Sequence, residues 1–190
     1  MMKNSALLFA ALWLLTACSS NPPMETVDEV DIDRFMGRWY VIAHIPTWPE
    51  REAYNAIEHY ELDDRGRVQT TFTFRRGGFD GPEREYNPTG IIRSDNGAEW
   101  GMQFIWPIKG EFLVIYLDDD YETTIIGRTR RDYVWIMSRN PAMDEQHYKD
   151  LKAFIASRGY DPDDLRRVPQ RWESSLSPAA NVSSQSPTWD

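Results

Sequence analysis

Apolar and polar residues alternate along most of the chain between residues 37 and 138. A period of two is typical of β-strands that bury one face. The run AEWGMQFIW (98–106) places its large apolar side chains on one face, namely Trp100, Met102, Phe104 and Trp106. The run EFLVIYL (111–117) does the same with Phe112, Val114 and Tyr116. The pattern therefore predicts a domain built from β-strands.

Turn-forming residues divide this region into eight predicted strands. The strands cover 37–46, 54–62, 67–76, 83–93, 98–106, 111–117, 121–128 and 132–138. Gly, Asp, Asn and Pro gather between them, as in DDRG (63–66) and SDNG (94–97). Eight antiparallel strands in chain order close most easily into a barrel, because closure leaves no exposed sheet edge. We therefore predict an all-β fold with an eight-stranded antiparallel up-and-down barrel.

A helical pattern follows the last strand. In PAMDEQHYKDLKAFIASRGYDP (141–162) one stripe carries Tyr148, Leu151, Phe154 and Ile155. Acidic residues in the first turn, Asp144 and Glu145, and Gly159 after the last turn are typical helix ends. Both faces of the strand 132–138 are apolar, so we expect this C-terminal α-helix to pack on the outer wall of the barrel. A short helical turn is also expected just before residue 37.

The N-terminus carries a short apolar run that ends at the single cysteine. Lys3 precedes ALLFAALWLLTA (6–17), which is too short to remain in a membrane as a span. The sequence LTAC resembles the cleavage and acylation site of bacterial lipoproteins. This resemblance implies a signal peptide over 1–17 and acyl chains on Cys18; a plain secretory signal with an incidental cysteine is the alternative. Ser19 is not the aspartate that retains such lipoproteins in the inner membrane, which favours the outer membrane.

Composition and charge fit one globular domain between two polar segments. The chain has 190 residues and a net charge of −9, and no Lys/Arg cluster is long enough to indicate nucleic-acid binding; the short RTRR (128–131) is better explained as a turn between strands. Residues 18–30 are polar and aperiodic, and we predict a lipidated tether there. We predict that residues 31–172 form the barrel and helix. Residues 173–190 are rich in Ser, Pro and Ala, and we predict a disordered tail.

The order of these features resembles the lipocalin family. Three motifs carry the resemblance: Gly37 and Trp39 on the first strand, Asp118 and Tyr121 in YLDDDY (116–121), and Arg139 after the last strand. With the cysteine site, the chain resembles the bacterial outer-membrane lipocalins, the branch of the family nearest to apolipoprotein D. Leu117 stands where the second motif usually has threonine. The resemblance implies a calyx that binds small hydrophobic ligands.

The motif residues are expected to be structural. A large flat side chain such as Trp39 can fill the narrow closed end of a barrel. Arg139 can lay its guanidinium group over the indole and donate to nearby carbonyl groups. Gly37 is expected to let the backbone bend into the first strand.

The inward-facing residues of the predicted barrel are candidates for ligand contact. They are Val41, Ala43, Trp100, Met102, Phe104, Phe112, Val114, Tyr116, Tyr133 and Trp135. The alternative is that they only fill the core. Basic residues near the open end could meet an anionic head group, among them Arg51, Arg75, Arg76 and Lys109. Trp48, in the long first link (47–53), is a candidate for a lid or a membrane contact.

Catalysis finds little support in the sequence. It has no nucleophile motif, no phosphate-binding glycine loop and no metal-type spacing of Cys and His. His44, His59 and His147 fall on different elements and are expected to be surface or wall residues. We therefore predict no enzyme activity, no cofactor and no metal.

Two functional hypotheses follow. In the first, the protein is an outer-membrane lipoprotein, anchored through Cys18 and facing the periplasm, that stores or transports fatty acids or lysophospholipids. In the second, the barrel is filled and the protein is a structural or interaction lipoprotein of the envelope. A homodimer is compatible with either.

Overall fold

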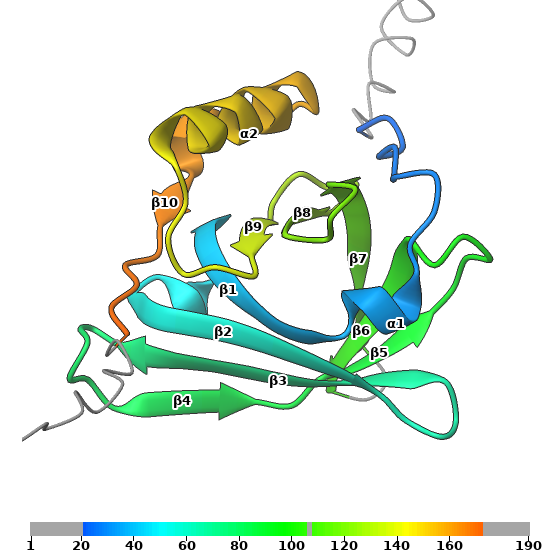
Figure 1. Cartoon of the computed structure of the whole chain (residues 1–190), viewed down its shortest axis with the longest axis horizontal. Helices are drawn as coiled ribbons and strands as arrows, with labels where there is room; N and C mark the ends of the chain where they lie inside the picture. The colour runs from blue at the N-terminus through cyan, green and yellow to red at the C-terminus, as the bar shows by residue number, and fades with distance from the viewer. Residues whose placement is uncertain (1–20, 106–107, 173–190) are drawn as a thin grey trace, which may run out of the picture.

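The computed structural model describes residues 21–105 and 108–172 (Figure 1). The predictions for the signal peptide, Cys18 and the tail therefore lie outside the described residues. The helices are α1 (Ile32–Phe35) and α2 (Glu145–Ser157), and the 3-10 turns are η2 (Trp48–Glu50) and η3 (Pro162–Asp164). The strands are β1 (Gly37–Ile45), β2 (Ala53–Leu62), β3 (Arg67–Arg76), β4 (Glu83–Tyr86), β5 (Thr89–Ile92), β6 (Glu99–Ile105), β7 (Ile108–Leu117), β8 (Thr123–Gly127), β9 (Val134–Ser138) and β10 (Arg166–Arg167).

Eight of the strands form a closed antiparallel barrel. Their order around the ring is β1, β2, β3, β5, β6, β7, β8 and β9, and pairing of β9 with β1 closes it. Two further strands are attached to the ring, β4 on β3 and β10 on β1. The predicted barrel is confirmed, and so is the short helical turn before its first strand.

The predicted strand 83–93 is wrong in one respect, because it consists of two strands. Pro88 lies between β4 and β5 and has no N–H group to contribute to a ladder. Both pieces pair with β3, β4 along Phe72–Arg75 and β5 along Arg67–Gln69. The ring continues to β6 through β5, so β4 is a side strand.

Helix α2 lies outside the ring beside β9 and β1, as predicted (Figure 1). Its buried residues are Tyr148, Leu151 and Ile155. They join the outward-facing side chains of the wall, such as Ile136 of β9, in a second apolar layer separate from the barrel interior. The barrel is therefore apolar on both sides where the helix covers it.

The residues expected at the two ends of α2 are there, but the helix begins one residue later than predicted. Asp144, predicted in the first turn, is the N-cap, and its carboxylate accepts from the N–H groups of Gln146 and His147. Arg158 is the C-cap, and Gly159 follows with a φ of 87°. A left-handed residue at this position suits glycine, so the predicted stop signal is confirmed.

The segment after α2 fills part of the barrel wall, which the sequence analysis did not predict. β1 pairs with β2 along Gly37–Tyr40, and nearer its end it pairs with β10 instead. The side-chain amide of Gln170 then donates to the carbonyl oxygens of Val41 (2.8 Å) and Ala56 (3.2 Å). This segment thereby joins β1 and β2 where the two strands diverge.

Part of the predicted tether (18–30) also packs on the barrel. The side chains of Met24 and Val30 are buried, and the N–H group of Val27 donates to the carbonyl oxygen of Val114 at 2.9 Å. Contacts with the barrel are therefore made by residues on the N-terminal side of residue 31 as well.

Candidate ligand-binding site

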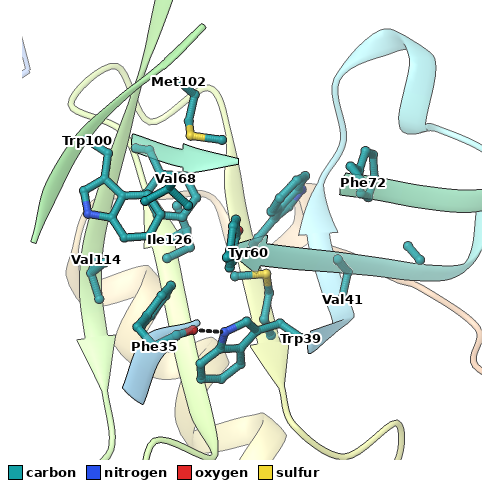
Figure 2. Close-up of a cluster of buried hydrophobic side chains, with 14 of the residues drawn as sticks. Phe35, Trp39, Val41, Tyr60, Val68, Phe72, Trp100, Met102, Val114 and Ile126 are labelled. Atoms are coloured by element: carbon teal, nitrogen blue, oxygen red, sulfur yellow. Dashed lines mark hydrogen bonds between the residues drawn. The ribbon is translucent and has the colours of Figure 1, made fainter. Parts of the chain in front are cut away.

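Trp39 closes one end of the barrel. Its side chain is fully buried, and its indole N–H donates to the carbonyl oxygen of Phe35 at 2.9 Å (Figure 2). The predicted stacking is present, since the Arg139 guanidinium carbon lies 3.7 Å from the centre of the indole ring. Arg139 also donates, over 2.8 to 3.1 Å, to four backbone carbonyl groups, those of Arg34, Phe35, Met36 and Arg38. It therefore ties the end of β9 to α1 and to the start of β1.

Gly37 belongs to the same arrangement. Its φ of 93° lies in the left-handed region, which residues with a side chain rarely adopt. A Cβ atom at this position would lie 3.4 Å from Nη1 of Arg139. Both the backbone conformation and the approach of the arginine explain the glycine.

The second motif also lies at the closed end. The Tyr121 hydroxyl accepts from the N–H group of Asp31 at 2.8 Å, and its carbonyl oxygen accepts from Nε of Arg139 at 3.3 Å. The Asp118 carboxylate accepts from the N–H group of Glu122 at 2.7 Å. These contacts join the turn between β7 and β8 to α1 and β9, so the motif residues hold the barrel closed.

A layer of aromatic rings lies above Trp39 (Figure 2). Phe35 and Tyr60 contact Trp100, whose ring stacks on that of Phe112 with 4.7 Å between the centroids. The indole N–H of Trp100 donates to the carbonyl oxygen of Gly97 at 2.7 Å. This aromatic layer fills the part of the barrel interior next to the closed end.

A cavity of about 320 Å³ lies in the other half of the barrel. Its walls come from β2, β3, β4, β6, β7 and β9 and from the links next to them. The lining residues are Thr47, Glu50, Glu58, Phe72, Tyr86, Met102, Gly110, Glu111, Phe112, Arg128, Tyr133 and Trp135.

The structure brings part of the predicted ligand-contact set to this cavity. Four of its members line the cavity, namely Met102, Phe112, Tyr133 and Trp135. Three others belong to the buried core of the barrel, namely Val41, Trp100 and Val114. The side chain of Phe104 is outside the described part of the chain.

Two members of the predicted set face the other way. Ala43 and Tyr116 belong to the apolar layer between the wall and α2, and the Tyr116 ring lies 5.5 Å from that of Phe154. The reason is a β-bulge in each strand, between Val41 and Ala43 in β1 and between Val114 and Tyr116 in β7. An extra residue in a strand reverses the alternation beyond it. The prediction that these two side chains face inward was therefore wrong.

The sequence analysis missed the polar groups of the interior. The same bulge turns His44 inward, where it is fully buried with Nδ1 3.4 Å from Oε2 of Glu50. The Trp135 indole N–H donates to that oxygen at 3.3 Å. Glu58 is 2% exposed on β2. A signal for Glu58 was available in the sequence, because it lies two residues from both Ala56 and Tyr60 and so shares their face of the strand; all three side chains are buried.

Burial governs the ionisation of this region. Desolvation, and then the nearby Glu50 carboxylate, raise the pKa of Glu58 well above its usual range. Desolvation, followed by Glu50 and Glu58, likewise raises the pKa of Tyr133. Both effects favour the neutral forms, because a charge in a poorly solvated site is unfavourable.

Two of the four basic candidates at the open end are already engaged in ion pairs. Arg75 pairs with Glu83 at 3.1 Å, and Arg76 lies 3.4 Å from Glu52. Arg51 is exposed, and the side chain of Lys109 is outside the described part. Trp48, in η2, is 74% exposed.

Comparison with known proteins identifies the family. The sequence model of the lipocalin-like domain matches residues 30–170. The chain belongs to the lipocalin family. It is 32% identical over 159 residues to temperature-induced lipocalin-1 of Arabidopsis thaliana, a match that covers 77% of this lipocalin and 83% of that protein.

Other similar proteins support the same family assignment. Outer membrane lipoprotein Blc of Escherichia coli (strain K12) is 29% identical over 165 residues, covering 80% of this lipocalin and 87% of Blc. Apolipoprotein D of Mus musculus is 26% identical over 175 residues, covering 82% and 84%. Among solved structures, insecticyanin of the tobacco hornworm Manduca sexta has a TM-score of 0.61 at 16% identity, covering 78% and 85%, which supports the fold.

Family membership sets the general function. Lipocalins are carriers of small hydrophobic ligands and are generally not enzymes. Within residues 21–105 and 108–172, the structure has no cluster of three or more His, Cys, Asp or Glu side chains that could hold a metal ion. In the same ranges, no helix of this lipocalin has the length and hydropathy to cross a membrane.

Proposed function

We propose that this lipocalin is an outer-membrane lipoprotein, anchored through Cys18 and facing the periplasm, that binds single-chain lipids in its cavity and stores or transports them. Fatty acids and lysophospholipids are the ligand class. The observation that carries the proposal is the cavity above the aromatic layer, because it leaves room for a ligand inside the barrel.

The cavity suits a single acyl chain. Ligand sites typically enclose about 300 to 1,000 Å³, so this one is at the small end of the range. Its walls include Phe72, Met102, Phe112 and Trp135, which are large, apolar and buried. A chain bound there would replace contact with water by contact with these rings, at about 0.8 kcal/mol for each buried CH₂ group.

The proposed anchor rests on the sequence LTAC and on the relatives. The matched proteins from Escherichia coli and Citrobacter freundii are named outer membrane lipoproteins. Several acyl chains on one cysteine give durable attachment, because each buried CH₂ group adds to the free energy of membrane binding.

Native mass spectrometry tests the ligand. The chain from Ser19 to Asp190 is purified without detergent, and we expect a stoichiometric adduct with the mass of a single-chain lipid. The same spectrum reports whether the protein is a dimer. A bare protein that also fails to take up added lysophospholipid would contradict the proposal and favour an interaction lipoprotein with another kind of partner.

Filling the cavity provides the matched test. In Met102→Trp the larger ring should occupy the space, so the adduct should be lost while the protein remains folded. Leu62→Trp, at a position that is 42% exposed on β2, is the control and should keep the adduct. Circular dichroism and the unfolding midpoint establish that both variants are folded. An adduct retained by folded Met102→Trp would place the ligand elsewhere.

A further inference from the structure

Strand β4 forms an edge in the wall of the barrel. It pairs with β3 along Phe72–Arg75, and within the described ranges no strand pairs with its other side (Figure 1). The ring continues from β3 to β6 through β5, and the ladder between β5 and β6 ends, toward the open end, at the pair of Thr89 and Gln103. Beyond that pair, the described part of the wall has no ladder between β4 and β6.

The inner face of β4 is exposed, although the inner face of β3 beside it is buried. Tyr86 lies opposite Phe72 and Arg84 lies opposite Phe74 in the ladder, so all four side chains share one face of the two strands. This face is the inner one, because Phe72 and Phe74 belong to the core of the barrel. Both phenylalanines are buried, whereas Tyr86 and Arg84 are exposed. The interior of the barrel is therefore open to solvent in front of β4.

The cavity extends as far as this side opening. Tyr86 lines the cavity and is 37% exposed. Four other large side chains of the cavity wall are no more than 4% exposed, namely Phe72, Met102, Phe112 and Trp135. The exposure of Tyr86 is therefore to solvent and not to the cavity alone. The cavity and the side opening are continuous at this residue.

The Tyr86 ring is held on one side. Its centroid lies 6.3 Å from that of Phe72 and 6.1 Å from that of Phe74, with interplanar angles of 28° and 14°. Both partners belong to β3, and among the described residues no ring from β5 or β6 stacks on Tyr86. Exposed side chains change rotamer within picoseconds to nanoseconds. Such a movement of Tyr86 would clear the opening without breaking a strand ladder.

The link between β1 and β2, at the open end of the barrel, is held more firmly. Glu50 accepts from the Trp135 indole N–H at 3.3 Å and from the Thr47 hydroxyl at 2.7 Å. The carbonyl oxygen of Glu52 accepts from the N–H group of Gly77 at 2.8 Å, in the turn between β3 and β4. A ligand that displaces this link has to break these hydrogen bonds. A ligand that passes β4 has to displace one aromatic ring.

We propose that single-chain lipids enter and leave the cavity through the side opening in front of β4, past Tyr86. The ring moves off Phe72 and Phe74 as the chain passes, and the two phenylalanine rings then offer an apolar surface along the path. The inference rests on the proposed function and adds the route by which the ligand reaches the same cavity.

Covalent blocking at single cysteines tests this route. The chain from Ser19 to Asp190 contains every described residue and no cysteine, so Tyr86→Cys and Trp48→Cys each introduce one thiol. Trp48→Cys is the matched control, because Trp48 is an exposed aromatic residue of the β1–β2 link. Each variant is labelled with a maleimide that carries a bulky polyethylene glycol chain. Stopped-flow fluorescence then follows the uptake of cis-parinaric acid, a single-chain lipid.

The two labels should have different effects on the rate of uptake. We expect the label on Tyr86→Cys to slow uptake at least about tenfold relative to the unlabelled variant, and the label on Trp48→Cys to change it less than about twofold. Slowing by the control label alone, equal slowing by both labels, or slowing by neither would overturn the inference. Circular dichroism and the unfolding midpoint establish that the labelled proteins are folded. An unchanged fluorescence at saturating probe shows that the cavity is intact.

Arg84→Cys gives a second position if loss of the Tyr86 ring destabilises the barrel. It lies on the same exposed inner face of β4 and leaves the ring in place. The same label should again slow uptake at least about tenfold, and unhindered uptake would contradict the proposed route. If the unlabelled chain takes up no probe, the proposed function itself fails. This outcome differs from uptake that no label on β4 slows.

Discussion

Glu58 is a carboxylic acid that the barrel encloses without a donor for Oε2 among the described residues. In the unfolded chain the same group is hydrated and ionises in its ordinary range. Folding therefore removes water from it and supplies little in exchange, which is unfavourable for the charged form. A side chain of this kind reduces stability, so its presence in the cavity wall is easier to explain by binding than by folding.

The stability of the protein should therefore depend on the charge of Glu58. Because its pKa is higher in the folded state, the folded protein binds more protons than the unfolded chain above the ordinary glutamate value of 4.5. Stability should fall as the pH rises from this value, by at most about 1.4 kcal/mol per pH unit. Glu58→Gln removes this effect, so its stability relative to wild type should increase from pH 4 to pH 7. Guanidine denaturation at several pH values measures the difference, and a constant difference would contradict the explanation.

Arg139 has the opposite effect on stability. Its guanidinium group donates to backbone carbonyls on both sides of Gly37 and covers the Trp39 ring. We expect Arg139→Ala to lower the free energy of unfolding by about 3 kcal/mol, since charged hydrogen bonds and a stacked cation are lost together. Arg139→Lys should recover less than half of this loss, because an ammonium group lacks the planar fork. Chemical denaturation checks both values, and equal stability of the lysine variant would show that charge alone suffices.

At the scale of the elements, the sequence predicted the strands better than the direction of their side chains. Alternation located β6, β7 and β9 and correctly directed Met102 and Trp135 inward. It failed for Ala43 and Tyr116, because a bulge depends on how two strands are paired and leaves no periodic mark in either sequence. The same limitation hid His44, which the bulge in β1 brings inside.

The segment after α2 could not be predicted from periodicity either. It has one short ladder, and most of its contacts are single hydrogen bonds made by or to the backbone. Such contacts depend on the gap between β1 and β2, which exists only in the assembled barrel. The side chain that bridges this gap, Gln170, is half-buried, but nothing in the sequence distinguishes it from a surface glutamine.

Removing the bridge should weaken the wall. Gln170→Ala leaves the carbonyl oxygens of Val41 and Ala56 without this donor, and we expect a loss of about 1 to 2 kcal/mol in the free energy of unfolding. Gln146→Ala is the matched control, because its amide bonds to Asp150 on the exposed face of α2. Denaturation should show little change in the control. A similar small change in Gln170→Ala would mean that water replaces the amide.

At the scale of the whole molecule, the three short motifs proved more informative than any single strand. Residues as distant in sequence as Trp39, Tyr121 and Arg139 meet at the closed end of the barrel. The resemblance to the family indicated that these residues act together. Their contacts are a cation stacked on an indole ring and hydrogen bonds from a guanidinium group to backbone carbonyls. The sequence could predict that the barrel has a ligand-binding cavity but not the size of that cavity. The size depends on how far the aromatic layer extends along the inside of the barrel.

The proposed anchor can be tested on the full chain. Cys18→Ser cannot be acylated, so we expect the protein to move from the membrane fraction to the soluble periplasmic fraction. Ser19→Asp keeps the cysteine and, in an enterobacterial host, should shift the protein from the outer to the inner membrane. Fractionation with detection by antibody measures both. A Cys18→Ser protein that remains in the outer membrane would show another mode of attachment.

The N-terminal segment has a consequence for how a ligand would reach the barrel. The Asn21 side chain donates to the carbonyl oxygen of Arg130 at 2.9 Å, in the turn between β8 and β9 that also carries Arg128 and Tyr133 at the cavity. Cys18 lies three residues before Asn21, and three extended residues span at most about 11 Å. If Cys18 is acylated as proposed, the turn that carries Arg128 and Tyr133 is linked to the bilayer by a stretch of chain that spans at most about 11 Å from Cys18 to Asn21. Exchange would then be a local, two-dimensional process between barrel and membrane, governed by the surface density of the lipid and not by its concentration in water.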